Sequence, residues 1–221
     1  MKFKKVLLSL VLTLALFSNA NAAPILTFLI DGDTFQNDFS ISNDSTDGEK
    51  ITGFQLDLRT ADNRICFDLD GNGDDSISDS CNAGNPGLSF VERSGGSDTG
   101  LISSSVIDAV GSLDAFDFLE VLFSDFGPGE EFSWAIDIDT FNGGRNGGIN
   151  GRQMIGSTVT VDFSSGIRAS GRLTAVDGNF DASAFIVESI TDITEASAPA
   201  TIVLFGLGLV GLSFARRRAS V

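Results

Sequence analysis

The sequence predicts an all-β protein whose body, residues 23–195, folds as an antiparallel β-sandwich or jelly roll. Short runs in this region alternate apolar with polar residues and are rich in β-branched and aromatic side chains. Clusters of Gly, Asn, Asp and Pro, which favour turns, separate the runs. Almost no segment of the body has helical periodicity. A chain of 221 residues holds one domain of ordinary size with targeting segments at its ends.

Residues 1–22 have the three parts of a secretory signal peptide. Lysines near the start precede an apolar run over 6–17, and the segment ends in small residues. Because the run is too short to span a membrane, cleavage between Ala22 and Ala23 is favoured over a retained N-terminal helix. The body is therefore expected to be exported.

Eight runs of the body have strand character, and they are separated by the turn clusters. They are 24–30, 38–43, 51–58, 116–126, 131–139, 157–163, 167–173 and 183–191. One hairpin stands out, because Val159, Val161 and Phe163 share a face and Gly166 can supply the positive φ of a tight loop. The stretch 93–100 indicates an exposed loop.

The body is strongly acidic, with 30 Asp and Glu against eight Lys and Arg, a net charge of −22. Such a surface repels phosphate backbones, so we expect no nucleic-acid partner. The chain has no His, which excludes Ser–His and Cys–His nucleophilic catalysis. We therefore expect a protein that is not an enzyme.

Cys66 and Cys81 are the only cysteines of the chain. An exported protein folds in an oxidising compartment, so this pair is predicted to form a disulfide. In the chain-entropy model, closing a loop of this size stabilises a fold by about 3 kcal/mol.

The loop between these cysteines is dense in oxygen ligands for a metal ion. Counted from Asp68 as position 1, positions 3, 5, 7 and 12 carry Asp70, Asn72, Asp74 and Asp79, with glycine at position 6. This spacing resembles the calcium loop of EF-hand and dockerin modules and implies bound Ca²⁺.

Two alternatives remain open for this loop. A start at Asp70 places Ile77 at the apolar position 8 but loses the glycine at position 6. The acidic residues could also be solvated, without a metal, in a loop closed by the disulfide.

Asp137 and Asp139 form a second acidic pair, within the run 131–139. Alternate residues of a strand point to one face, so the two could act as acid and base on a glycoside. The simpler interpretation is the solvated face of a strand that ends in a turn.

The chain ends in an apolar stretch followed by basic residues. Residues 201–215 carry no charge, which is about 22 Å of helix. Counting Pro199 and Ala200 gives a membrane helix over 199–215, near the lower limit for a span. The next three residues, Arg216, Arg217 and Arg218, predict a stop-transfer signal that stays in the cytoplasm.

In the order of its parts, the tail 196–221 resembles the PEP-CTERM sorting signal of Gram-negative bacteria. Ser197-Ala198-Pro199 stands in place of the Pro-Glu-Pro of that family, and Ala200 and Thr201 follow. The resemblance implies an exosortase-type processing enzyme as partner, cleavage near Ala198-Pro199 and transient anchoring in the inner membrane. The alternative is a permanently anchored periplasmic protein.

Together these patterns predict a surface or biofilm-matrix protein that associates with exopolysaccharide and has Ca²⁺ as its cofactor. A carbohydrate-binding module or a weak polysaccharide-active enzyme is the alternative, because calcium-containing β-sandwiches often bind sugars.

Overall fold

The computed structural model describes residues 23–69, 81, 87–109, 116–140 and 149–187. In these residues the chain forms antiparallel sheets and two single-turn 3-10 helices, η1 (Leu58–Thr60) and η3 (Gly151–Met154). This confirms the predicted all-β class. No helix within the described ranges has the length and apolarity needed to cross a membrane. The predicted signal peptide and the helix over 199–215 lie outside these ranges.

One layer of the molecule is a six-stranded antiparallel sheet. Its strand order is β12 (Thr174–Ala175), β13 (Ala182–Val187), β1 (Leu26–Asp31), β2 (Phe39–Asn43), β8 (Glu131–Ala135) and β5 (Val91–Ser94). β1 alternates buried and half-buried residues because one face of its pleat covers the core.

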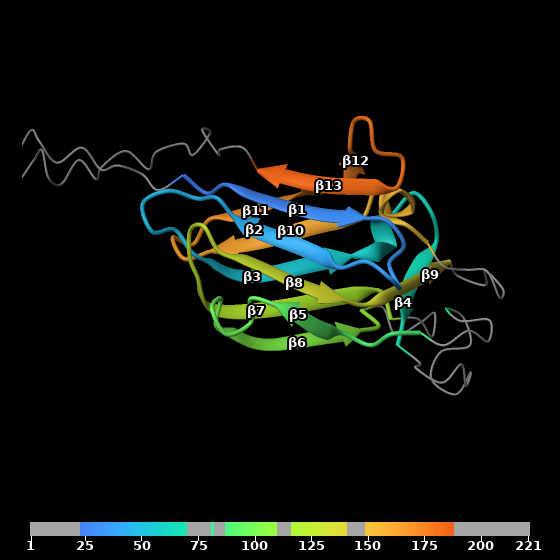
Figure 1. Ribbon diagram of the computed structural model, residues 1–221, viewed down its shortest axis with the longest axis horizontal. Coiled ribbons are helices and arrows are strands. Elements are labelled where there is room, and N and C mark those ends of the chain that lie inside the picture. Colours follow the sequence, from blue (N-terminus) through green and yellow to red (C-terminus); the bar gives the residue numbers. More distant parts are fainter. Residues whose placement is uncertain (1–22, 70–80, 82–86, 110–115, 141–148, 188–221) are drawn as a thin grey trace, which may run out of the picture. The chain divides into compact units, whose positions relative to one another are not determined.

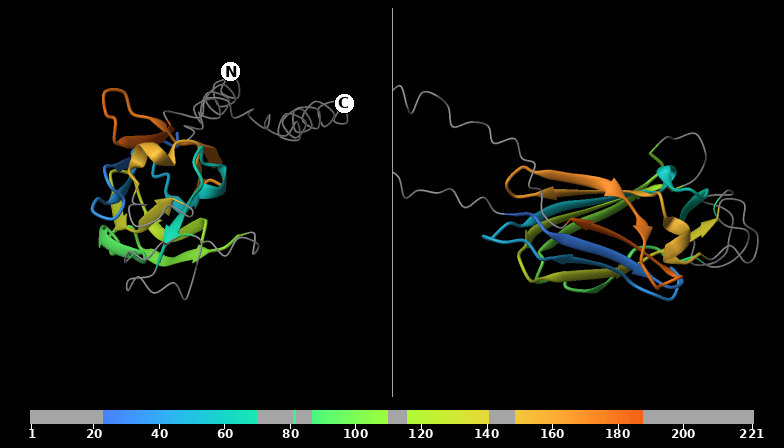
Figure 2. Two further views of the ribbon diagram at one scale, coloured as in Figure 1. Left: turned by 90° about the vertical axis from the view of Figure 1, so that its right-hand side faces the viewer. Right: turned by 90° about the horizontal axis from the view of Figure 1, so that it is seen from above.

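The second layer is a five-stranded antiparallel sheet that faces the first, so that the two form a β-sandwich (Figures 1 and 2). Its order is β11 (Arg168–Arg172), β10 (Thr158–Phe163), β3 (Ile51–Asp57), β7 (Phe118–Phe126) and β6 (Leu101–Ile107). The predicted hairpin is confirmed as β10 and β11, with Gly166 at φ +85° in its loop.

Aromatic side chains from both sheets fill the space between them. Phe28 on β1 packs on Phe54 of β3 with ring centroids 4.7 Å apart, and Phe132 on β8 packs on Phe123 of β7 at 5.1 Å. Trp134 lies fully buried among these rings, 5.3 Å from Phe54. Burial of this aromatic area stabilises the sandwich.

A small ribbon of two strands, β4 (Ile65–Asp68) and β9 (Asp137–Thr140), lies at one end of the sandwich (Figure 1). The predicted run 131–139 is not one strand. It divides at the buried Ile136, so that β8 pairs with β2 and β5 whereas β9 pairs with β4. This division turns the second half of the run out of the large sheet.

Candidate metal centre

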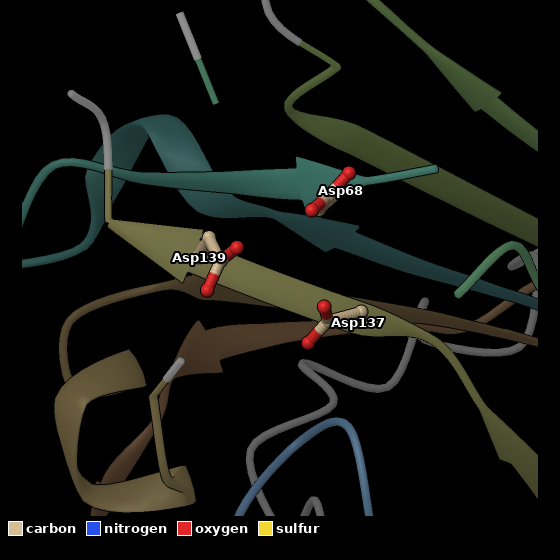
Figure 3. Close-up of side chains that lie close together, drawn as sticks. All are labelled: Asp68, Asp137 and Asp139. Carbon is tan, nitrogen blue, oxygen red and sulfur yellow. The ribbon is translucent and has the colours of Figure 1, made fainter. Parts of the chain in front are cut away.

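Three aspartate side chains converge on the two-stranded ribbon (Figure 3). Asp68 ends β4, and Asp137 and Asp139 lie on β9. One carboxylate oxygen of each lies within 4.8 Å of the others. The three residues are only 2%, 4% and 4% exposed, respectively. They form a buried acidic cluster, which we call the Asp triad.

The strand register explains why these residues meet. β4 and β9 pair antiparallel with Asp68 opposite Asp137 and Cys66 opposite Asp139. Residues directly opposite one another point to the same side of a ribbon, as do residues two apart on one strand. Asp68, Asp137 and Asp139 therefore share one side of the ribbon.

Thr34, in the loop after β1, fixes the backbone next to Asp137. Its buried hydroxyl lies 3.1 Å from the Ile138 carbonyl oxygen and 3.2 Å from that of Ile149, and it accepts the Ile138 N–H at 3.3 Å. One carboxylate oxygen of Asp137 lies 3.5 Å from the same hydroxyl. The β1–β2 loop thus sets the position of the first half of β9.

Gly87 and Leu88, in the segment before β5, contact Asp68 and Asp137 of the triad. The Leu88 N–H donates to the Asp68 carbonyl at 3.0 Å, and the Leu88 carbonyl accepts the Asp137 N–H at 2.9 Å. Gly87 lies so close that a Cβ added to it would be 2.3 Å from the carboxyl carbon of Asp68. Only glycine leaves the space that the Asp68 carboxylate occupies.

Burial and repulsion between charges disfavour ionisation of two members of the Asp triad, Asp137 and Asp139. Burial raises the pKa of Asp137 to about 7, and the charges of Asp139 and Asp68 add to the increase, against the Ile138 N–H, which lowers it. Burial and the neighbouring Asp68 raise the pKa of Asp139 to about 6. A cation among the three carboxylates would relieve both effects.

The donor set indicates which cations could bind. All three ligands are carboxylate oxygens, which are preferred by hard cations such as Ca²⁺, Mg²⁺ and Mn²⁺ rather than by metals that favour sulfur or imidazole. The arrangement of the triad is thus that of a candidate hard-cation centre.

The predicted ligand set overlaps this centre at one residue. Asp68 belongs to it, whereas the other predicted ligands, Asp70, Asn72, Asp74 and Asp79, lie outside the described residues. Placing Asp137 and Asp139 on a solvated face was wrong, because the β4 ribbon and the segment around Leu88 cover them. The paired aspartates were visible in the sequence, but their register against β4 was not.

The predicted disulfide is confirmed next to the centre. Cys66 and Cys81 are bonded, with their Cα atoms 5.6 Å apart, and both are buried. Cys66 lies two residues before Asp68 and opposite Asp139. The disulfide therefore ties Cys81 to the strand that carries the first aspartate.

The predicted processing residues lie mostly outside the described ranges. Ala23 is described, and its N–H donates to the Thr46 hydroxyl at 3.2 Å. The described residues do not include Ala22, Ser197 to Thr201 or Arg216 to Arg218.

Comparison of the chain with protein-family models, with curated proteins and with solved structures finds no match.

Proposed function

We propose that this chain is an exported, non-enzymatic β-sandwich protein of the bacterial surface or extracellular matrix, and that a calcium ion bound at the Asp triad stabilises it. The observation that carries the calcium proposal is the burial of three converging carboxylates at one end of the sandwich. Burying that much negative charge is costly unless a cation or protons neutralise it.

Two features support calcium over smaller hard cations. Ca²⁺ takes six to eight oxygens, whereas the triad alone supplies three carboxylates. The chain continues from Asp68 directly into a loop with further carboxylates, Asp70, Asp74 and Asp79, and the amide of Asn72. We propose that this loop completes the coordination from side chains and backbone carbonyls.

Export and sorting rest on the sequence and on the disulfide. A disulfide persists in an oxidising compartment, consistent with a leader over 1–22. The tail 196–221, with its likeness to PEP-CTERM signals, supports anchoring in the inner membrane followed by exosortase cleavage. Together with the acidic surface, this supports a role beside exopolysaccharide rather than nucleic acid.

Calcium titration tests the metal proposal. The full chain, first treated with EDTA, should release or absorb heat on addition of Ca²⁺, and its melting temperature should rise. Asp137→Asn with Asp139→Asn should remove both responses. Asp177→Asn, at an exposed position far along the chain from the triad, is the matched control and should respond as the wild type does. Equal calcium responses in all three proteins would exclude the Asp triad as the site.

A glycan array tests the association with exopolysaccharide. The calcium-loaded protein should bind acidic polysaccharides only through bridging calcium, so chelation should release them. Binding of one defined glycan with or without calcium would instead identify a carbohydrate-binding module.

A further inference from the structure

β6 is an edge strand with an unusual surface. It pairs with β7 on one side and forms the end of the five-stranded sheet on the other. Most of its side chains are exposed, including Ile102 at 63% and Ile107 at 46%. Apolar side chains on a free strand edge favour pairing with another chain.

The other edge strands are protected in the ways that proteins commonly use. β12 has two residues, β5 has four and carries Glu92 and Arg93, and β11 carries Arg168 and Arg172. Short length and charged side chains both discourage pairing between chains. Among the edges that the structure describes, β6 alone is seven residues long and free of charge.

The sequence of β6 is nearly symmetric about its central residue, Ser104. It reads Leu-Ile-Ser-Ser-Ser-Val-Ile. Two such strands paired antiparallel about this residue place Ser104 opposite Ser104 and Ser103 opposite Ser105. The same register places Ile102 opposite Val106 and Leu101 opposite Ile107. Hydroxyls then meet hydroxyls and aliphatic groups meet aliphatic groups, both favourable pairs across antiparallel strands.

We propose that β6 pairs antiparallel with β6 of a second copy of this chain, about a two-fold axis at Ser104. The pairing joins the two five-stranded sheets edge to edge. A two-fold axis requires one surface to be complementary to itself, and the near-symmetry of β6 provides this. In the pairing of β6 with β7, the register shifts between Leu101 and Ser103. Ser103–Ile107 is therefore the part of β6 that pairs regularly with β7.

Charge favours contact between two copies at this edge, because the edge repels a second copy less than the other surfaces do. The body carries −22, so two copies repel over most of their surface. The contact strand has no charge, and β5, on the same side of the sandwich in Figure 1, carries one charge of each sign. Screening by salt should therefore strengthen the dimer.

Cysteine cross-linking tests the pairing and its register. The natural cysteines are bonded and buried, so an added thiol is the only free one. The full chain is kept in mild detergent because of the apolar segment 201–215. On oxidation Ser104→Cys should become a disulfide-linked dimer, because directly opposite Cβ atoms lie about 4.5–5.5 Å apart.

Two further cross-linking samples fix the register. Ser103→Cys alone should stay unlinked, but a mixture of Ser103→Cys with Ser105→Cys should link. Ala175→Cys, on the exposed edge strand β12, is the matched control and should form no disulfide link between copies. Equal linking of Ser104→Cys and Ala175→Cys would show random collision and overturn the proposal.

A charge substitution tests the same interface without cross-linking. Ser104→Lys places two lysines opposite each other across the axis, which disfavours the pair. Ala175→Lys changes the net charge equally on another edge. In sedimentation at raised salt, the wild type and Ala175→Lys should be dimers and Ser104→Lys a monomer. A monomeric wild type at all salt and protein concentrations would overturn the proposal.

Discussion

Asp137 shows how strongly one buried carboxylate can oppose folding in the absence of a cation. Its pKa of about 7, against 3.8 for an ordinary Asp, means that ionisation is costly in the folded state. At about 1.4 kcal/mol per pKa unit, the rise from 3.8 to about 7 costs on the order of 4 kcal/mol at pH 8.

Asp137→Asn should therefore raise the free energy of unfolding of the metal-free protein at pH 8, and abolish stabilisation by Ca²⁺. Urea denaturation with EDTA and with excess calcium measures both effects. Asp177→Asn is the control for the change in net charge. A variant less stable than wild type in EDTA would contradict the proposed cost of the Asp137 charge.

The pH dependence of stability follows from the same raised pKa values. Between about pH 4 and 7 the folded state holds protons on Asp137 and Asp139 that the unfolded chain has released. The stabilisation that these two protonated residues give the folded state is thus fully present below about pH 4, and it is lost as the pH rises through 6 and 7.

The measurement is the difference in free energy of unfolding, in EDTA, between wild type and the Asp137→Asn, Asp139→Asn double variant. From about pH 4 to 7 the wild type should become less stable relative to the double variant, and above pH 7 the difference should stay constant. Calcium competes with the protons, so the rise in melting temperature on adding Ca²⁺ should grow over the same interval. A calcium effect that is larger at pH 5 than at pH 8 would contradict the assignment.

Gly87 offers a test of the space beside Asp68. Gly87→Ala adds a Cβ where the Asp68 carboxyl group lies, so the group must shift. We expect calcium affinity to fall by about tenfold or more, since ligand position governs coordination. Gly178→Ala is a control in an open turn with nothing near the added atom; it should bind calcium as the wild type does, despite strain at its positive φ.

At the level of elements, the disulfide couples strand β4 of the ribbon to Cys81. Replacing Cys66 and Cys81 together by Ser should lower the free energy of unfolding by about 3 kcal/mol, because the unfolded chain gains freedom. Calcium affinity should fall as well, because Asp68 lies two residues from Cys66. Thermal unfolding and calcium titration measure the two effects, and unchanged calcium affinity would separate the disulfide from the metal centre.

The strands that the sequence predicts are those whose own pattern is strong. β1, β2, β3, β7, β10 and β13 alternate or concentrate apolar residues, and the structure contains all of them. β5 and β6 escaped prediction because edge strands bury little and carry polar side chains. β4 was not predicted, because it is only four residues long and its last residue, Asp68, was interpreted as the first ligand of a metal loop. The Asp triad depends on pairing between segments about 70 residues apart, which no local pattern contains.

For the whole molecule, the decisive prediction concerns processing of the two ends. The mature protein isolated from its native cells should begin at Ala23 and should lack the tail beyond Ala198. Intact mass measures both ends at once. A mass that includes Arg216 to Arg218 would exclude release by an exosortase and leave a permanent anchor.

The position of Trp134 makes its fluorescence a probe of contact between the two sheets. The chain has one Trp and no Tyr, so its intrinsic fluorescence on excitation of indole comes from a single site. That site is fully buried where the two sheets meet, with Phe28, Phe39, Phe54, Phe90 and Phe132 around it. Parting of the layers admits water to the indole and moves its emission to longer wavelength, so opening can be timed in unlabelled protein.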